Sequence, residues 1–193
     1  MERIGIFGGT FDPIHIGHLV AGVNAKHALQ LDRVLFVVAN QPWQKSDRAV
    51  TAAEQRLALV EAAVEDAPGL EASRLEIDRG GDSYTADTLE ALAEGPDRDL
   101  FLVIGADVAA ELDTWERIDV VRNLATLVVV NRPGTAVPDV GPGWRVQAVE
   151  IPQLEISSSD LRARAADGRP LDHVVPRAVI NRIRELGLYA GGR

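Results

Sequence analysis

A glycine-rich turn directly behind a short apolar run constrains this chain more than any other stretch. Residues 4–7 are apolar and lead straight into Gly8–His18, which reads Gly-Gly-Thr-Phe-Asp-Pro-Ile-His-Ile-Gly-His. Paired glycines let a backbone leave a strand at angles that other residues avoid, and they allow it to approach a ligand closely. Pro13 fixes its own φ and disfavours helix at Asp12, so a turn is expected there before a helix begins. This order of strand, turn and helix predicts a phosphate-binding site, although neither common phosphate-binding glycine fingerprint is present.

Two histidines follow this turn. His15 and His18 are three residues apart, which places both imidazoles on one face of a helix, facing the glycine turn. Such a pair also occurs in zinc sites, but zinc usually needs a third protein ligand. The chain has no cysteine, and His27 and His173 are its other two histidines. Phosphate binding is therefore the preferred interpretation, because imidazoles donate hydrogen bonds to phosphate oxygens.

Length, composition and charge limit the class of protein. With 193 residues, of which 46% are hydrophobic, the chain is expected to form a single domain over residues 1–193. A formal net charge of -9 argues against nucleic acid or an anionic membrane as a partner. The absence of cysteine excludes disulfides. It suits a reducing compartment, and no apolar run is long enough to span a membrane, so a cytoplasmic location is expected.

Apolar runs alternate with amphipathic stretches along the chain. This alternation predicts a Rossmann-like, doubly wound and mostly parallel α/β sheet with a short C-terminal helical segment. Thr51 and Thr85 are expected to cap the second and third helices. Strands are expected at 4–7, 34–39, 75–77, 100–104 and 127–130, with a last one nearer a sheet edge at 144–149. Helices are expected at 18–30, behind Thr51 to about 64, at 86–94, from 107 to about 123, at 157–166 and from 176 to before 187.

Several polar loops follow these predicted strands. They are residues 8–18, 40–45, 105–107 and 131–132. In a parallel sheet, ligands bind beyond the carboxyl ends of the strands, so these loops are expected to meet at one site. Ser157–Arg162 adds free helix amides, hydroxyls and a guanidinium. That segment is interpreted either as a second phosphate clamp or as an ordinary serine cap.

Together these motifs resemble those of bacterial nicotinate mononucleotide adenylyltransferases. The resemblance rests on the turn Gly8–His18, on Ser83–Thr85, on Gly105–Asp107 with Trp115 beyond it, and on Ile156–Arg162. It implies transfer of the adenylyl group of ATP to the 5′-phosphate of nicotinate mononucleotide, with release of pyrophosphate. It also implies Mg²⁺ as cofactor, bound through the ATP phosphates and not by protein side chains.

The resemblance also implies two groups of site residues. His15 and His18 would be catalytic, and Lys45 would hold the acceptor phosphate. The ATP side would comprise Gly8, Gly9, Thr10, Phe11, His15, His18, Gly105, Asp107, Ser158 and Arg162. The acceptor side would comprise Asn40, Lys45, Thr85, Trp115 and Arg132.

One segment departs from the family pattern. The family commonly has Pro-His-Lys before the acceptor lysine, whereas here Pro42 is followed by Trp43 and Gln44. We hypothesise that the loop 40–48 opens and closes with substrate.

Two alternatives stay open on the sequence alone. Pantetheine-phosphate adenylyltransferases share the glycine-histidine turn, but they are usually shorter and lack the pairing of Ser-Tyr-Thr with Gly-Ala-Asp and a later tryptophan. A non-catalytic nucleotide sensor could use the same fold, but retention of both histidines, Lys45 and Arg162 argues against it. The sequence is also compatible with a homo-oligomer.

Overall fold

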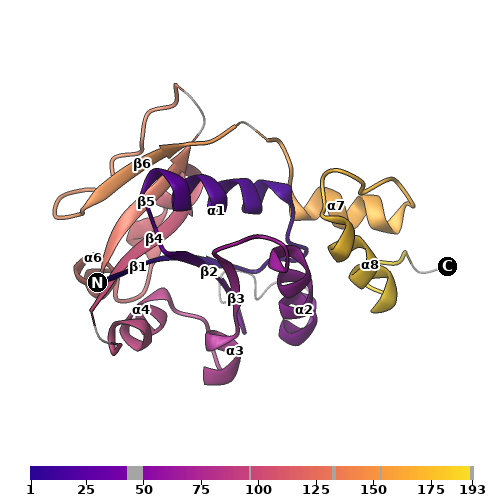
Figure 1. Cartoon of the computed structure of the whole chain (residues 1–193), viewed down its shortest axis with the longest axis horizontal. Coiled ribbons are helices and arrows are strands. Elements are labelled where there is room, and N and C mark those ends of the chain that lie inside the picture. The colour runs from indigo at the N-terminus through magenta and orange to yellow at the C-terminus, as the bar shows by residue number, and fades with distance from the viewer. Residues whose placement is uncertain (43–49, 96, 132–133, 153, 192–193) are drawn as a thin grey trace.

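A six-stranded sheet forms the centre of the molecule, and neighbouring strands all pair in parallel. The computed structural model describes residues 1–42, 50–95, 97–131, 134–152 and 154–191. The strand order is β3-β2-β1-β4-β5-β6, so the chain starts in the middle, builds one half and returns to build the other (Figure 1). This confirms the predicted Rossmann-like, doubly wound fold. The strands are β1 Glu2–Gly9, β2 Arg33–Val38, β3 Leu70–Ser73, β4 Arg98–Gly105, β5 Ala125–Asn131 and β6 Val146–Glu150.

Helices cover both faces of the sheet. Side chains alternate between the faces with a period of two, so Phe36 joins one core while Leu35 and Val37 join the other. The first core is closed by α1, α2, α7 and α8, and the second by α4 and α6. Because both faces are covered, the central strands are continuous apolar runs. The helical elements are α1 Ile16–Ala28, α2 Ala53–Val64, α3 Leu75–Arg79, α4 Thr85–Ala93, α5 Ala106–Ala109, η2 Leu112–Thr114, α6 Ile118–Leu124, α7 Ser158–Ala166 and α8 Arg177–Glu185.

The predicted strand at 75–77 is wrong. The third strand is β3, where Leu70 lies opposite Val34 of β2, and residues 75–79 form the short helix α3. The apolar side chains at 75 and 77 pack against two different cores, whereas residues two apart in a strand would face the same one, and the chain has already left the sheet after Ser73. An apolar pattern this short does not distinguish a strand from one helical turn.

The predicted helix from 107 to about 123 is interrupted. It divides into α5, η2 and α6, because Trp115 is extended and Arg117 adopts a left-handed φ of 52°. The guanidinium of Arg117 forms ion pairs with Asp87 and Glu90 of α4, which hold the break against that helix.

The two expected threonine caps are also wrong. Helix α2 begins after Ala52, because the backbone N–H and C=O of Thr51 are bound by Asp12 and Arg56 instead. Helix α4 begins one residue early, so Thr85 is its first residue and the extended Tyr84 precedes it. The cap of α7 is as predicted, since the Ser157 side chain accepts the Asp160 N–H.

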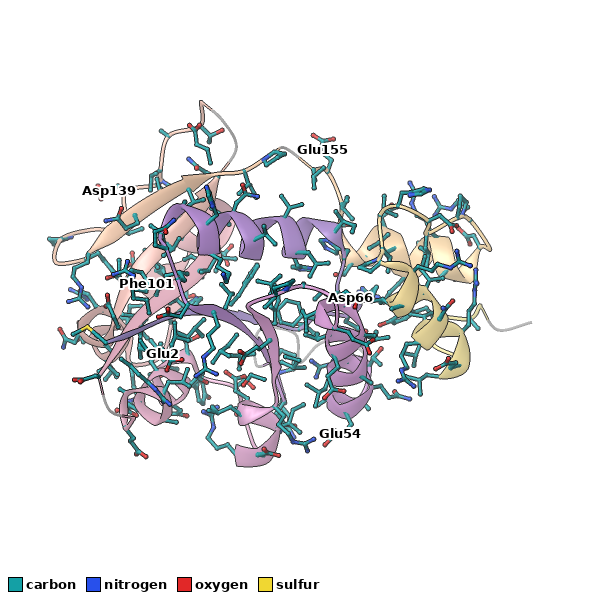
Figure 2. The ribbon with its side chains drawn as sticks, in the orientation of Figure 1. Glu2, Glu54, Asp66, Phe101, Asp139 and Glu155 are labelled. Atoms are coloured by element: carbon teal, nitrogen blue, oxygen red, sulfur yellow. The ribbon has the colours of Figure 1, made fainter. Side chains whose placement is uncertain are left out.

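Helices α7 and α8 form one end of the molecule, beside α2 (Figure 1). The labelled acidic side chains in Figure 2, such as Glu54, Asp66, Asp139 and Glu155, lie on the outside of the fold, where the charge is solvated. Phe101 of β4 lies inside, between the sheet and its covering layer. Within the described ranges, no helix combines the length and the apolar character needed to cross a bilayer.

Candidate active site

The candidate site lies where the strand order reverses, between β1 and β4. Parallel sheets open a crevice at this point, beyond the carboxyl ends of the strands. Two cavities occupy it, one of about 780 Å³ and one of about 250 Å³. Gly8, Gly9, Thr10 and Gly105 line both, so the ends of β1 and β4 form the wall between them. We call the larger one the donor cavity, because the residues predicted for the ATP side line it, and the smaller one the acceptor cavity, because Thr85 and Trp115, predicted for the acceptor side, line it.

The donor cavity brings together all ten residues predicted for the ATP side. They come from β1, the following turn, α1, the end of β4 and the start of α7. Residues that are far apart in sequence, such as His18 and Arg162, therefore line one space. The ten are Gly8, Gly9, Thr10, Phe11, His15, His18, Gly105, Asp107, Ser158 and Arg162.

The two histidines stack on each other at the start of α1. Their ring centroids are 3.7 Å apart, and the backbone N–H of His15 donates to Nδ1 of His18 over 3.2 Å. Since Nδ1 accepts, the neutral His18 ring carries its proton on Nε2, where it is a donor. His15 is the residue before the helix and is only 7% exposed. Burial lowers its pKa from 6.5 to about 4, so His15 is neutral at pH 7.

Two phenylalanine rings pack against the His18 ring and hold its orientation. The ring meets Phe7 and Phe11 edge-on, with centroids 6.0 and 5.1 Å away. Phe11 has a φ of 50°, and its ring lies over Gly9, where an added Cβ would stand 2.7 Å from a ring carbon. Gly9 is therefore required for the close packing that holds Phe11, and through it His18.

The turn at Asp12 and Pro13 is anchored by α7. Nη1 of Arg162 donates to the Asp12 carbonyl over 2.7 Å, and the Ser158 hydroxyl donates to the Pro13 carbonyl over 2.9 Å. The peptide bond between Asp12 and Pro13 is cis. The hydroxyl proton of Ser158 is thus engaged within the protein, which leaves the backbone N–H groups at the start of α7 as donors toward an anion.

Asp107 is an exposed residue of α5, just after β4, and it lines the donor cavity. Its side chain folds back over Gly105, where an added Cβ would stand 2.5 Å from Oδ1. Glycine at 105 therefore allows the carboxyl group of Asp107 to lie across the end of the strand.

The acceptor cavity contains some of the residues predicted for it. Thr85 and Trp115 line it. Asn40 does not: its N–H donates to the Ser83 hydroxyl over 2.8 Å, and its side chain donates to the Gly81 carbonyl over 2.9 Å. Asn40 thereby ties the end of β2 to the segment before α4. Lys45, Arg132 and the hypothesised loop with Trp43 and Gln44 lie outside the described residues.

A buried carboxyl group in the acceptor cavity was missed by the sequence reasoning. Glu76 is 6% exposed and accepts the Thr88 hydroxyl over 2.5 Å. Burial raises the pKa of Glu76, and hydrogen bonds from Ser83 and Thr88 oppose that rise. No sequence signal indicated it, because position 76 was assigned to a strand. Tyr84 and Glu116 are further polar residues that line the acceptor cavity.

Arg56 of α2 was also missed. It is 1% exposed, and its guanidinium donates to the carbonyls of Thr10, Ala39 and Thr51 over 2.8, 2.6 and 2.7 Å. Burial lowers the pKa of Arg56, and the nearby Asp12 charge offsets part of that. The sequence does not indicate that Arg56 is buried, because a charged residue in an amphipathic helix is normally exposed.

Among the residues that the structure describes, no group of three or more His, Cys, Asp or Glu side chains is arranged to hold a metal ion. Asp12 lies within the turn Gly8–His18, and its carboxyl group already accepts two hydrogen bonds from the protein.

Comparisons with known proteins identify the family of the chain. Residues 6–164 match the cytidylyltransferase-like family model. A probable nicotinate-nucleotide adenylyltransferase of Streptomyces coelicolor is 48% identical to this chain, and the match covers 95% of this chain and 99% of the relative. A probable nicotinate-nucleotide adenylyltransferase of Corynebacterium kroppenstedtii is 47% identical, and the match covers 97% of this chain and 90% of the relative. The fold resembles Plasmodium falciparum nicotinic acid mononucleotide adenylyltransferase complexed with NaAD, with a TM-score of 0.81, 18% identity and 98% of each chain covered. The chain therefore belongs to the nicotinate-nucleotide adenylyltransferases of the cytidylyltransferase-like family.

Proposed function

We propose that this protein transfers the adenylyl group of ATP to the 5′-phosphate of nicotinate mononucleotide, forming nicotinate adenine dinucleotide and pyrophosphate. The observation that carries the proposal is the pair of cavities sharing one wall at Gly8–Thr10 and Gly105. Two substrates bound on either side of that wall meet at the strand ends. The curated relatives carry the corresponding name over nearly the whole chain.

The donor cavity would hold ATP. Nε2–H of His18 would donate to an oxygen of the α-phosphate as charge develops there, in a pocket where its orientation is already fixed. Neutral His15 would orient His18 through their stacked rings. Arg162 and the first amides of α7 would bind the outer phosphates, and Asp107 would bind the adenosine ribose.

Mg²⁺ would accompany ATP, held by phosphate oxygens and water. When bound, it neutralises phosphate charge. The described residues offer no cluster of ligands that would compete for it.

The acceptor cavity would hold the nicotinate ring against Trp115, near the first turn of α4. The N–H of Thr85 lies in that turn and has no acceptor within the helix, so it can donate to the nicotinate carboxylate. Lys45 and Arg132 would meet the acceptor phosphate. A phosphate monoester with a second pKa of about 6 is largely dianionic at pH 7, so the reaction needs no strong general base.

In the transfer itself, an acceptor phosphate oxygen forms a bond to the α-phosphorus of ATP. The bond from that phosphorus to the bridging oxygen breaks, and pyrophosphate leaves with the electron pair. Positioning and charge stabilisation supply the catalysis, as is general for phosphoryl chemistry.

The test is a pyrophosphate-release assay with ATP and Mg²⁺. Nicotinate mononucleotide, nicotinamide mononucleotide and phosphopantetheine are offered in parallel, with no acceptor as the control. We expect the highest kcat/KM with nicotinate mononucleotide. Preference for phosphopantetheine would instead assign the chain to the pantetheine branch, and no release with any acceptor would favour a nucleotide sensor.

A further inference from the structure

The carboxyl group of Asp12, which lies in the turn Gly8–His18, accepts hydrogen bonds from two distant parts of the chain. Asp12 is 5% exposed. The Tyr189 hydroxyl donates to Oδ1 over 2.6 Å, and the backbone N–H of Thr51 donates to Oδ2 over 3.3 Å. Burial and the adjacent Asp12 carboxyl both raise the pKa of Tyr189, so the phenol stays protonated and remains a donor.

Tyr189 lies beyond the last helix, in a segment that packs back onto the first core. Its φ is 59°, and both Tyr189 and Leu188 contact that core. Helix α8 brings the segment there by packing on α2. The chain terminus therefore reaches a turn 177 positions earlier in the sequence.

Arg56 connects the same turn to α2. It donates to the Thr10 carbonyl, two residues before Asp12, and to the Thr51 carbonyl, whose N–H binds Asp12. Arg162 of α7 donates to the Asp12 carbonyl. The side chain and the backbone of Asp12 are thus held by different parts of the chain, three residues before His15.

We propose that Asp12 and Tyr189 are positioning residues for adenylyl transfer, through which the C-terminal segment orients the turn that carries His15 and His18. This rests on the proposed function. Loss of the Tyr189 hydroxyl leaves one oxygen of a buried carboxyl group without its donor. The turn can then relax, and small displacements of a catalytic group cost large factors in rate because alignment is lost.

Tyr189→Phe in the full chain tests the proposal, because the ring still packs and only the hydroxyl is lost. We expect kcat to fall about tenfold, with the KM values for both substrates within twofold of wild type. Ile183→Val in α8 is the matched control: it trims a buried residue of the same C-terminal unit and is expected to lower Tm by a few degrees without changing kcat. An unchanged kcat in Tyr189→Phe, or an equal loss in Ile183→Val, would overturn the proposal.

A double variant separates positioning from general destabilisation. Asp12→Ala removes both acceptor oxygens, so adding Tyr189→Phe to it should lower kcat by less than twofold further. Multiplicative losses would show that the two residues act independently, against the proposal.

A spectroscopic measurement keeps the proposal testable even if the proposed reaction fails. The imidazole nitrogen resonances of His18 are recorded by ¹⁵N NMR in the protein without substrate. Tyr189→Phe should shift them and Ile183→Val should not. Unchanged His18 resonances in Tyr189→Phe would overturn the positioning role, whereas absent turnover in wild type would overturn only the reaction.

Discussion

The donor and acceptor cavities share a wall but are built in different ways. The largest continuous contribution to the donor cavity is the stretch of residues 7–21, and the rest of the lining comes from the ends of β4 and β5, the segment between β6 and α7, and the start of α7. The acceptor cavity is assembled from short pieces near residues 39–42, 76–88 and 102–116, with a buried carboxyl group among them. The residues predicted for the ATP side thus come mainly from a local motif, whereas those predicted for the acceptor side come from separate loops. That difference predicts that substitutions in the two cavities will affect different kinetic constants.

The largest expected effect is that of His18→Ala in the donor cavity. Removing a fixed donor to developing charge should lower kcat by about 10²–10³-fold and change the KM for the acceptor little. Steady-state kinetics with both substrates varied measure this, and circular dichroism checks that the fold is intact. His27→Ala, an exposed histidine at the other end of α1, is the matched control and should keep wild-type kcat. A near-normal kcat in His18→Ala would remove this residue from the mechanism and weaken the division between the cavities.

An intermediate effect is expected for Trp115→Ala in the acceptor cavity. Loss of a stacking surface for the nicotinate ring should raise the KM for nicotinate mononucleotide between tenfold and a hundredfold, since stacking on an aromatic residue is worth about 1–3 kcal/mol per base. The KM for ATP should stay within threefold. Trp144→Ala is the matched control, because Trp144 packs outside both cavities against α6. Equal changes in both KM values would show that Trp115 supports the shared wall and not acceptor recognition alone.

The same division explains how far the sequence predicts the structure. The central strands were predicted because parallel strands covered on both faces are apolar throughout, as in 100–104 and 127–130. The turn Gly8–His18 carries its own signals in glycine, proline and histidine spacing. Helix α3 and the break at Arg117 were missed because they depend on contacts with α4 and on where β3 ends, which no local pattern encodes.

The candidate site shows the same limit. All ten predicted donor residues line one cavity, because a single motif and one helix start supply most of them. On the acceptor side, Asn40 does not line the cavity, because its backbone N–H donates to the Ser83 hydroxyl and its side chain to the Gly81 carbonyl, and the burial of Glu76 was not foreseen. A polar residue on a short segment is normally solvated, and only its tertiary partners, here Thr88 and Ser83, make its burial tolerable.

The smallest expected effect is a difference between the two cavities in how the unfolding free energy depends on pH. The His15 pKa is about 4 in the folded protein and 6.5 when unfolded, so below pH 6.5 the unfolded chain takes up a proton that the folded state does not. This contribution to stability is complete above pH 6.5 and is lost as the pH falls toward 4. Between pH 8 and 5.5 wild type should lose about 1 kcal/mol more unfolding free energy than His15→Asn, measured by urea denaturation.

The contribution of Glu76 in the acceptor cavity to folding stability changes with pH in the opposite direction. Its folded pKa is raised above the unfolded 4.5, so the folded state holds its proton more tightly, and its contribution is lost as the pH rises from 4.5. Glu76→Gln keeps an oxygen acceptor for the Thr88 hydroxyl but cannot ionise, so it should lose less stability than wild type as the pH rises through this range. Urea denaturation of Glu76→Gln, His15→Asn and the double variant tests both signs, and the two effects should add because the sites are separate. If the two single variants shift the pH profile in the same direction, the cavities do not differ electrostatically in the way their burial implies.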